Sequence, residues 1–252
     1  MQNNEIKTHI NQDLGLIQSA NGLTFATDAY LLSAFVKKSP RARAVDLGSG
    51  TGVIPMLCMA NGKFSKCYAV EVQKTFADII DKNIELNGFG EKIISVCDDL
   101  RNIKAATLGG EVDIVTANPP YMKADSGKRN DHDEKFIARH EVYGGIVDFC
   151  SCASRILKHG GKFYTVFRPD RLCDLIAALR ENKLEPKRIT FVHATAQSEP
   201  SMVLIQSTKG GTSGSIVTRP LILHDGKDEA AKSILSLDAQ RIYNTCSFED
   251  FK

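Results

Sequence analysis

Short apolar runs alternate with segments of helical spacing along most of this 252-residue chain, and this alternation strongly constrains the fold. Short apolar runs predict strands, and apolar residues three or four positions apart predict helices. We expect strands at 43–47, 66–72, 92–96, 112–117, 162–167, 187–193 and 201–205. We expect helices at 53–60, 73–86, 141–157 and 169–181, with residues 159–161 (His-Gly-Gly) ending the third. This order is typical of an α/β protein whose sheet closes with an antiparallel pair.

A glycine-rich turn follows the first predicted strand. Residues 46–52 read Asp-Leu-Gly-Ser-Gly-Thr-Gly, and glycine suits a chain that turns sharply and lies against a ligand. Dinucleotide-binding proteins use a related turn, but their glycines include a three-residue step. Here the glycines alternate strictly after an acidic residue. We therefore take Asp46, Gly48 and Gly50 as candidate cofactor-binding residues.

Acidic residues stand at the ends of the next two strands. Glu71 ends the second strand, where a carboxylate can accept both hydroxyls of a ribose. It could also be a solvent-facing carboxylate with no ligand. Asp98 and Asp99 follow the third strand, and either can accept from the amine of an adenine. We favour Asp99, which Leu100 follows, although the residues do not decide between the two neighbours.

The tetrad Asn118-Pro119-Pro120-Tyr121 follows the fourth strand. Its prolines lack the N–H of a ladder bond, so they end the strand and stiffen the turn. The Asn118 amide and the Pro119 carbonyl could each accept one N–H of a planar amine, while Tyr121 covers the ring. The same residues could also form only a turn with a core tyrosine. Their place at the ligand-binding edge favours Asn118, Pro119 and Tyr121 as catalytic residues.

The glycine turn, the strand-end acids and this tetrad together resemble the class I S-adenosylmethionine-dependent methyltransferases, over about residues 20–206. The resemblance implies a seven-stranded, Rossmann-like α/β sheet, mostly parallel with one antiparallel strand. It implies that S-adenosylmethionine lies across the ends of the first three strands and also near Asn118. A methyl group would then move directly to the amine that Asn118 aligns, without a strong general base.

Two further stretches resemble the bacterial valine-tRNA adenine-N6 methyltransferases. Residues 25–32 read Phe-Ala-Thr-Asp-Ala-Tyr-Leu-Leu, and a Thr-Asp pair at this place lies beside the cofactor in that family. The resemblance implies this role for Thr27 and Asp28. Residues 137–141 also match, although His140 could simply cap or pack at a helix start. The implied reaction is N6-methylation of an adenine in tRNA, near the anticodon.

The tetrad alone leaves other acceptors open, because it is similar to that of enzymes acting on an rRNA guanine amine or a protein glutamine amide. The glutamine-modifying enzymes typically carry a helical N-terminal domain, for which residues 1–40 leave little room. A cofactor-binding RNA assembly factor without turnover is the non-enzyme alternative. The intact tetrad argues against that alternative.

The net charge of +2 conceals an uneven distribution. Between residues 155 and 188 nine basic residues face only four acidic ones. A solvated helical surface explains such a run as well as a nucleic-acid footprint does. Under the tRNA hypothesis this run, with Lys123, Lys128 and Arg129 of the loop after the tetrad, would hold phosphates.

The bulk features suggest a cytoplasmic protein. The N-terminus lacks a signal-peptide pattern, and no apolar run reaches the length of a membrane span. Seven cysteines without a CxxC pair predict neither a metal site nor disulfides, and no obligate protein partner is evident. We divide the chain into an N-terminal segment (1–40) over the cofactor site, a methyltransferase catalytic core (41–206) and a C-terminal extension packed on the core (207–252).

Overall fold

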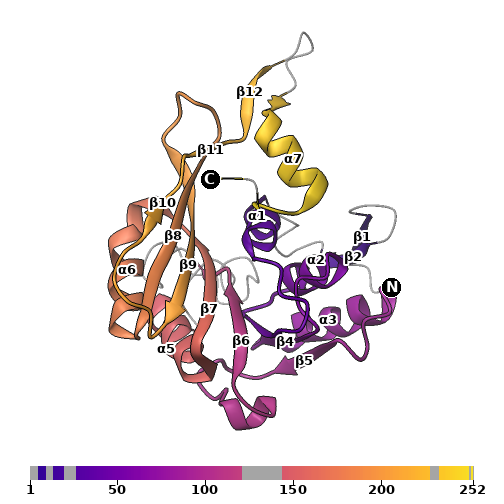
Figure 1. The fold of residues 1–252 in the computed structure, drawn as a ribbon. Helices are drawn as coiled ribbons and strands as arrows, with labels where there is room; N and C mark the ends of the chain where they lie inside the picture. The colour runs from indigo at the N-terminus through magenta and orange to yellow at the C-terminus, as the bar shows by residue number, and fades with distance from the viewer. Residues whose placement is uncertain are drawn as a thin grey trace, which may run out of the picture.

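One large twisted sheet organises the fold (Figure 1). The computed structural model describes residues 5–9, 14–19, 27–120, 144–227, 233–249 and 251. Tyr121, His140 and the lysines and arginine expected in the loop after the tetrad therefore lie outside the described residues. Within the described ranges, no helix is both long enough and apolar enough to cross a membrane.

The sheet contains the seven predicted strands in the order β8-β9-β7-β6-β3-β4-β5. Their bounds are β3 (Arg43–Leu47), β4 (Lys66–Glu71), β5 (Ile93–Cys97), β6 (Val112–Ala117), β7 (Leu157–Phe167), β8 (Leu184–His193) and β9 (Pro200–Lys209). Only β9 runs antiparallel to its neighbours, β7 and β8, within this set of seven. The predicted fold class is confirmed, and two short strands, β10 (Ile216–Val217) and β11 (Leu221–Ile222), add to the edge at β8.

Several predicted boundaries match the structure, and one does not. The strands at 43–47 and 112–117 and the helix at 53–60 have the predicted bounds. The expectation that residues 159–161 end a helix is wrong, because α5 (Ile146–Ile156) has already ended and these residues continue β7. Leu157 is fully buried and pairs with Val112 across the ladder, so tertiary pairing overrides the local glycine signal.

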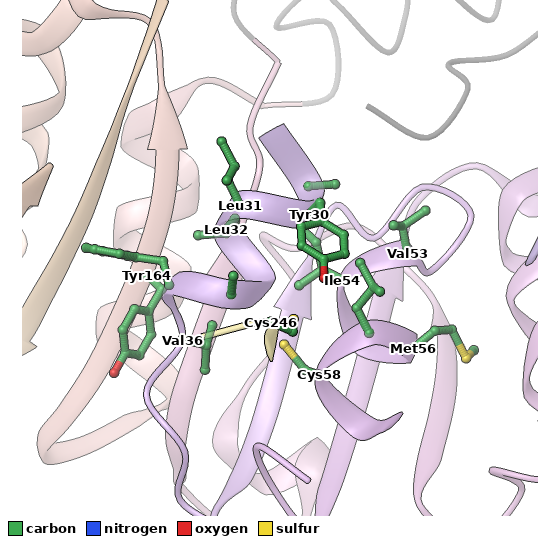
Figure 2. Packing of buried hydrophobic residues seen from close by; sticks show 14 of the residues in the cluster. Tyr30, Leu31, Leu32, Val36, Val53, Ile54, Met56, Cys58, Tyr164 and Cys246 are labelled. Carbon is green, nitrogen blue, oxygen red and sulfur yellow. The ribbon is translucent and has the colours of Figure 1, made fainter. Parts of the chain in front are cut away.

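Helices cover both faces of the sheet. On one face α1 (Thr27–Phe35), α2 (Val53–Ala60) and α3 (Lys74–Leu86) bury residues in one core, which also contains Tyr164 and Val166 of β7 (Figure 2). On the other face α5, α6 (Leu172–Glu181) and the short helix η1 (Ala105–Leu108) share a second core with Phe163 and Phe167. Alternate residues of β7 point to opposite faces, so one strand supplies both cores.

Asn83 of α3 and Asn87, directly after that helix, hold a hairpin formed by β1 (Glu5–His9) and β2 (Gly15–Ser19). Asn83 accepts from the Ile17 amide at 2.7 Å and donates to the Ile17 carbonyl at 3.0 Å. Asn87 makes the same pair of bonds with Gly15, at 3.1 and 2.9 Å. The side-chain amides thus pair with the hairpin as a neighbouring strand would, because each presents both a donor and an acceptor to the backbone of one residue.

The C-terminal residues return to the body of the protein. A hairpin of β12 (His224–Lys227) and β13 (Ser233–Leu235) leads into α7 (Leu237–Thr245), whose first turn is capped by Ser236 at 3.1 Å from the Ala239 amide. Figure 1 shows α7 above α1, and the two helices are in contact. Phe248 and Phe251, beyond α7, are buried in the same core as Phe35 of α1.

Candidate active site

The predicted site residues gather at the carboxyl edge of the parallel strands. The glycine turn follows β3, Glu71 ends β4, Asp98 and Asp99 follow β5, and Asn118 follows β6. These four strands are neighbours in the order β6-β3-β4-β5, so their ends lie side by side. Ligands bind at this edge in open α/β sheets.

The glycine turn needs glycine for its backbone conformation. Gly48 and Gly50 have φ angles of 65° and 55°, which residues other than glycine rarely adopt. A Cβ at Gly48 would lie 3.1 Å from the ring of Phe149, whereas a Cβ at Gly50 would meet nothing within 4 Å. Gly48 is thus required for packing as well as for the turn, while the space beside Gly50 can receive a ligand.

Asp46 lies beneath this turn and is 1% exposed. Its carboxylate accepts from the hydroxyls of Ser49 and Thr116, each at 2.5 Å. Burial raises the pKa of Asp46 to about 7, although both hydroxyl bonds act to lower it. The carboxylate thus braces the turn from below, tying β3 to the residue paired with it on β6.

Glu71 is fixed against the glycine turn. Its carboxylate accepts from the Gly50 amide at 2.8 Å and from the Gln73 amide at 2.9 Å. Burial raises its pKa, and bonds from the backbone and from the Gln73 side chain oppose that rise. A buried strand-end carboxylate held by the turn is not the solvent-facing acid that the sequence left open.

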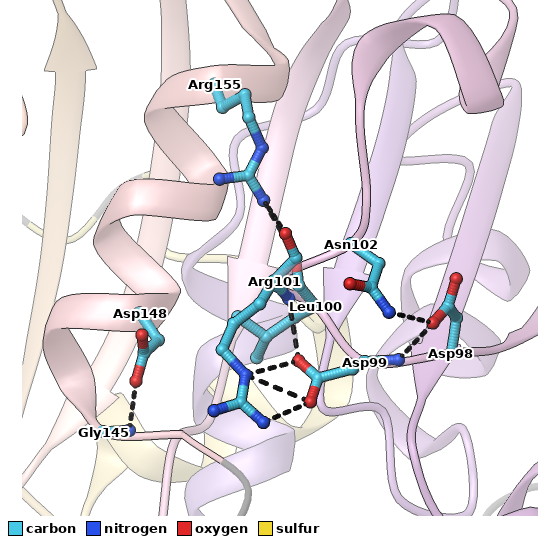
Figure 3. Close-up of polar contacts among 8 residues, drawn as sticks. All are labelled: Asp98, Asp99, Leu100, Arg101, Asn102, Gly145, Asp148 and Arg155. Atoms are coloured by element: carbon cyan, nitrogen blue, oxygen red, sulfur yellow. Dashed lines mark hydrogen bonds and ion pairs between the residues drawn. The ribbon is translucent and has the colours of Figure 1, made fainter.

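Asp98 and Asp99 turn in different directions (Figure 3). Asp98 accepts from the Asn102 side chain at 2.9 Å, while Asp99 forms a two-pronged ion pair with Arg101, the shorter contact being 2.5 Å. The bond from Arg101 lowers the pKa of Asp99. Both carboxylates stay at the end of β5, and Asp99 is ionised with its orientation fixed by Arg101.

Asn118 contacts a residue 90 positions away. Its side-chain nitrogen donates to Asp28 Oδ2 at 3.0 Å, and Asp28 Oδ1 accepts from the Ala29 amide at 2.7 Å. This bond identifies the amide nitrogen, because a carboxylate only accepts, and it fixes the direction of the amide oxygen. Pro119 is buried behind Asn118, so the amide sits on a rigid support.

The first turn of α1 is held by the C-terminal helix. Thr27 forms a side-chain hydrogen bond with Tyr243 of α7, and the Tyr30 hydroxyl donates to the Tyr243 carbonyl at 2.7 Å. The two tyrosine rings lie 4.9 Å apart. Asp28 thus belongs to a helix end that residues 237–245 stabilise, a link that no local pattern in the sequence indicated.

Asn83 is a second supporting residue that the sequence analysis missed. Besides holding the hairpin, its side chain donates to the Thr51 carbonyl in the glycine turn at 2.9 Å. It is fully buried in a helix whose apolar face includes Ile80 and Ile84. A polar residue on an apolar helix face could have indicated such a bond, because buried amides need partners.

The assembled edge can bind a nucleoside and an amine. It offers an open glycine turn, ionisable carboxylates at two strand ends, and an aligned amide. Among the described residues, no group of three or more His, Cys, Asp or Glu side chains could hold a metal ion. All seven cysteines are free.

Comparison with known sequences gives a consistent set of matches. A family model described as Methyltransferase small domain matches residues 14–180. A tRNA1(Val) (adenine(37)-N6)-methyltransferase from Porphyromonas gingivalis is 25% identical over 215 residues, covering 82% of this chain and 84% of its own. A protein of the same name from Bacteroides fragilis is 28% identical over 182 residues, covering 72% and 76%.

Solved structures share the fold. A protein described as a predicted O-methyltransferase from Agrobacterium tumefaciens superposes with a TM-score of 0.69 at 22% identity, covering 88% of this chain and 97% of its own. TYW2 from M. jannaschii, solved in complex with AdoMet, gives a TM-score of 0.55 at 14% identity, covering 82% and 86%. At these identities the likeness concerns the arrangement of the sheet and helices.

Proposed function

The chain belongs to the Methyltransferase small domain family, and from this premise we propose that it transfers a methyl group from S-adenosylmethionine to N6 of an adenine in tRNA, near the anticodon. The names of its relatives support this acceptor, because those that match most of the chain are described as tRNA1(Val) (adenine(37)-N6)-methyltransferases. We also propose that it acts in the cytoplasm, and a tRNA substrate supports this.

The observation that carries the proposal is the bond between Asn118 and Asp28. It joins the end of β6 to the start of α1 at 3.0 Å and directs the amide oxygen of Asn118. An amide held in one orientation by a carboxylate can accept an N–H of the incoming amine without reorganising. A turn that served only to reverse the chain would not need a hydrogen bond to Asp28, which lies 90 positions away in the sequence.

The residues at the edge fit the cofactor. S-adenosylmethionine, when bound, supplies a methyl group attached to positively charged sulfur. We propose that Gly48 and Gly50 admit its amino-acid part, and that Glu71 accepts from its ribose. The Gln73 side chain now donates to Glu71, and a ribose hydroxyl, which is also a donor, would take over that position. Asp99 would accept from the adenine amine.

Asn118 and Pro119 would prepare the acceptor. The lone pair of an adenine amine is delocalised into the ring, so the nitrogen attacks poorly while it stays planar. Hydrogen bonds to the Asn118 oxygen and the Pro119 carbonyl favour a pyramidal nitrogen. As the new N–C bond forms and the S–C bond breaks, positive charge develops on nitrogen, and the two oxygens stabilise it. The proton then leaves to solvent, since the product is very acidic.

Tyr121 remains a proposed stacking residue. An enzyme that modifies a base must remove it from its stack, and an aromatic side chain compensates part of that cost. We propose that Tyr121, directly after the rigid Asn118-Pro119-Pro120 segment, covers the face of the target adenine. Thr27 and Asp28 would line the same pocket from α1.

Methyl transfer with labelled S-adenosylmethionine tests the acceptor. Purified protein is incubated separately with tRNA, ribosomal RNA and a release factor, and the RNA nucleosides are then analysed by mass spectrometry. We expect N6-methyladenosine in tRNA only, and no label with Asn118→Ala. Label in rRNA guanine or in a protein glutamine would contradict the adenine assignment. Tight RNA binding without transfer to any acceptor would favour the assembly-factor alternative.

A further inference from the structure

A basic groove lies on the sheet away from the candidate active site. It encloses about 1050 Å³ between the end of α1, the strands β7, β8 and β9, residues 211–219 and the C-terminal segment. Figure 1 shows the C-terminal segment reaching between α1 and β8, where this groove lies. The groove therefore combines parts of the chain that are far apart in the sequence.

Paired strand residues build the floor of the groove. Lys162 of β7 pairs with Thr208 of β9, and Gln206 of β9 pairs with Arg188 of β8. These positions share the sheet face that carries Tyr164 and Val166, because side chains two apart on a strand point the same way. Lys37, just after α1, and Lys187 add two more cations, while a fifth, Arg219, forms an ion pair with Asp238.

Three of the other four cations donate to neutral acceptors. The Lys162 ammonium donates to the Thr208 hydroxyl at 2.9 Å, and Lys187 donates to the carbonyls of Thr212 and Gly214 at 3.0 and 2.6 Å. Arg188 donates to the Phe251 carbonyl at 2.9 Å. No carboxylate of the described residues lies within ion-pair distance of any of the four, and Glu249 is the one acidic residue among the described lining.

The rest of the basic run between residues 155 and 188 behaves differently. Arg168 and Arg180 form ion pairs with Asp170 and Glu185, while Lys158 pairs with Asp113. Arg155 instead donates to backbone carbonyls of residues 100, 101 and 103. Acidic partners thus compensate four of the nine basic residues, including Arg171 with Asp174, and three of the other five line the groove, while Arg155 and Lys183 lie outside it.

The lysines in the groove repel one another. The pKa of Lys162 is lowered, first by burial and then by the charges of Lys187 and Lys37. Each of these ammonium groups retains donors beyond the bonds described, because an ammonium has three. A bound anion would reduce the repulsion between these ammonium groups, because it offers both a compensating charge and hydrogen-bond acceptors.

The groove and Asn118 are separated by the length of α1. That helix begins beside Asn118, and just past its end the Lys37 amide lies 3.4 Å from the Tyr164 hydroxyl, near the groove floor (Figure 2). Nine helical residues span about 13 Å. Four strand residues, from Ile114 beside Lys162 to Asn118, give about the same distance.

We infer that this groove binds the phosphate backbone of the RNA substrate at a second contact, remote from the nucleotide being methylated. The inference rests on the proposed function, since it takes a structured RNA as the substrate. A groove of this size with several separated cations fits a chain of phosphates better than a single small anion. Such contacts position an RNA without reading its sequence.

Charge removal in the groove tests the inference. The groove variant carries both Lys162→Gln and Lys187→Gln. The control variant carries both Lys92→Gln and Arg180→Gln, which remove the same charge from exposed positions outside the groove. Binding of full-length tRNA and of a trinucleotide with a central adenine is measured by fluorescence anisotropy at several salt concentrations. Methyl-transfer kinetics and thermal melting are recorded for each protein.

We expect the groove variant to lose about tenfold in affinity for full-length tRNA, with a log–log salt slope shallower by about 2, since each phosphate contact contributes about 0.9. It keeps wild-type affinity for the trinucleotide, which is too short to span from the active site to the groove. Its kcat at saturating tRNA and its melting temperature match those of the control.

Two results would overturn the inference. One is full-length tRNA binding equal to that of the control pair, which would leave the groove to an acidic protein partner. The other is an equal loss with the trinucleotide, which would place these charges beside the active site. If the wild-type protein binds tRNA through the groove but transfers no methyl group to it, the groove stands and the proposed function fails.

Discussion

The candidate active site and the basic groove use polar groups in opposite ways. At the active-site edge, Asp46, Glu71 and Asn118 are each fixed by hydrogen bonds of 2.5 to 3.0 Å to named partners. In the groove, the ammonium groups of Lys162 and Lys187 hold neutral acceptors and face one another. The first region is organised for geometry, and the second for charge.

This difference follows from what each region must do. Direct transfer between two atoms depends on alignment, so its residues must be held before the substrate arrives. Attraction of a phosphate backbone depends mainly on the number of cations and falls as salt rises. Substitutions at the active-site edge should therefore change kcat or cofactor affinity. Substitutions in the groove should instead change RNA affinity and its salt dependence.

Replacing Asn118 should give the largest effect. Asn118→Ala removes an acceptor that acts mainly as charge develops, so we expect kcat to fall by at least about 10² to 10³. S-adenosylmethionine affinity, measured by calorimetry, and the salt slope of tRNA binding should stay close to the wild-type values. A folded Asn118→Ala protein that no longer binds the cofactor would contradict the assigned role.

Replacing Glu71 should affect cofactor affinity instead of turnover. Glu71→Gln keeps the shape of the side chain but removes its charge, and a hydrogen bond to a charged group contributes about 1.5 to 3 kcal/mol. We expect the Kd for S-adenosylmethionine, measured by calorimetry, to rise by about 10- to 100-fold. Transfer at saturating cofactor should recover most of the activity. Unchanged cofactor affinity would exclude Glu71 as the ribose acceptor.

The contact between Asp28 and Asn118 should have a smaller, graded effect. Asp28→Ala frees the Asn118 amide to rotate, and we expect kcat to fall about tenfold, the cost of one hydrogen bond to a charged group. Asp28→Asn retains an oxygen that can accept from Asn118, so it should recover much of the rate in the same methyl-transfer assay. Equal losses in both variants would argue that Asp28 acts through its charge.

Asp46 should change stability more than activity. Because its pKa rises from 3.8 to about 7 in the folded protein, the folded state holds a proton that the unfolded state has released between these values. This contribution makes stability fall as pH rises from about 4 to 7, by on the order of 1 to 4 kcal/mol. We expect Asp46→Asn to flatten that dependence in urea unfolding. If the stability of both proteins fell equally with pH, the raised pKa of Asp46 would be excluded.

Local signals were reliable where burial alone decides structure. The strand at 43–47 and the strand at 112–117 are short apolar runs with a clear end, a glycine turn in one case and prolines in the other. Residues 159–161 misled because their glycines resemble a helix stop, while the pairing of Leu157 with Val112 made them part of a strand. The edge strands β10 and β11 are only two residues long, too short to show a period.

The same division holds for the candidate site. Spacing after strands predicted that Gly48, Glu71 and Asn118 would meet at one edge, because carboxyl ends of parallel strands lie together. It could not show that Asn118 binds Asp28, or that Tyr243 holds the helix carrying Asp28, since these partners are far apart in the chain. Asp46 had been expected to bind the cofactor, and the structure places its carboxylate beneath the turn, bonded to Ser49 and Thr116.

The sequence by itself determined which residues follow each strand, and these residues were enough to identify a family of methyl-transfer enzymes. The tertiary structure alone decided which cations lie together, because folding makes neighbours of residues that are far apart in the chain. Nine basic residues between 155 and 188 look alike in the sequence. Arg168 and Arg180 pair with acids two and five positions away, whereas folding brings Lys162 and Lys187 together with Lys37 in a groove that the order of residues does not reveal.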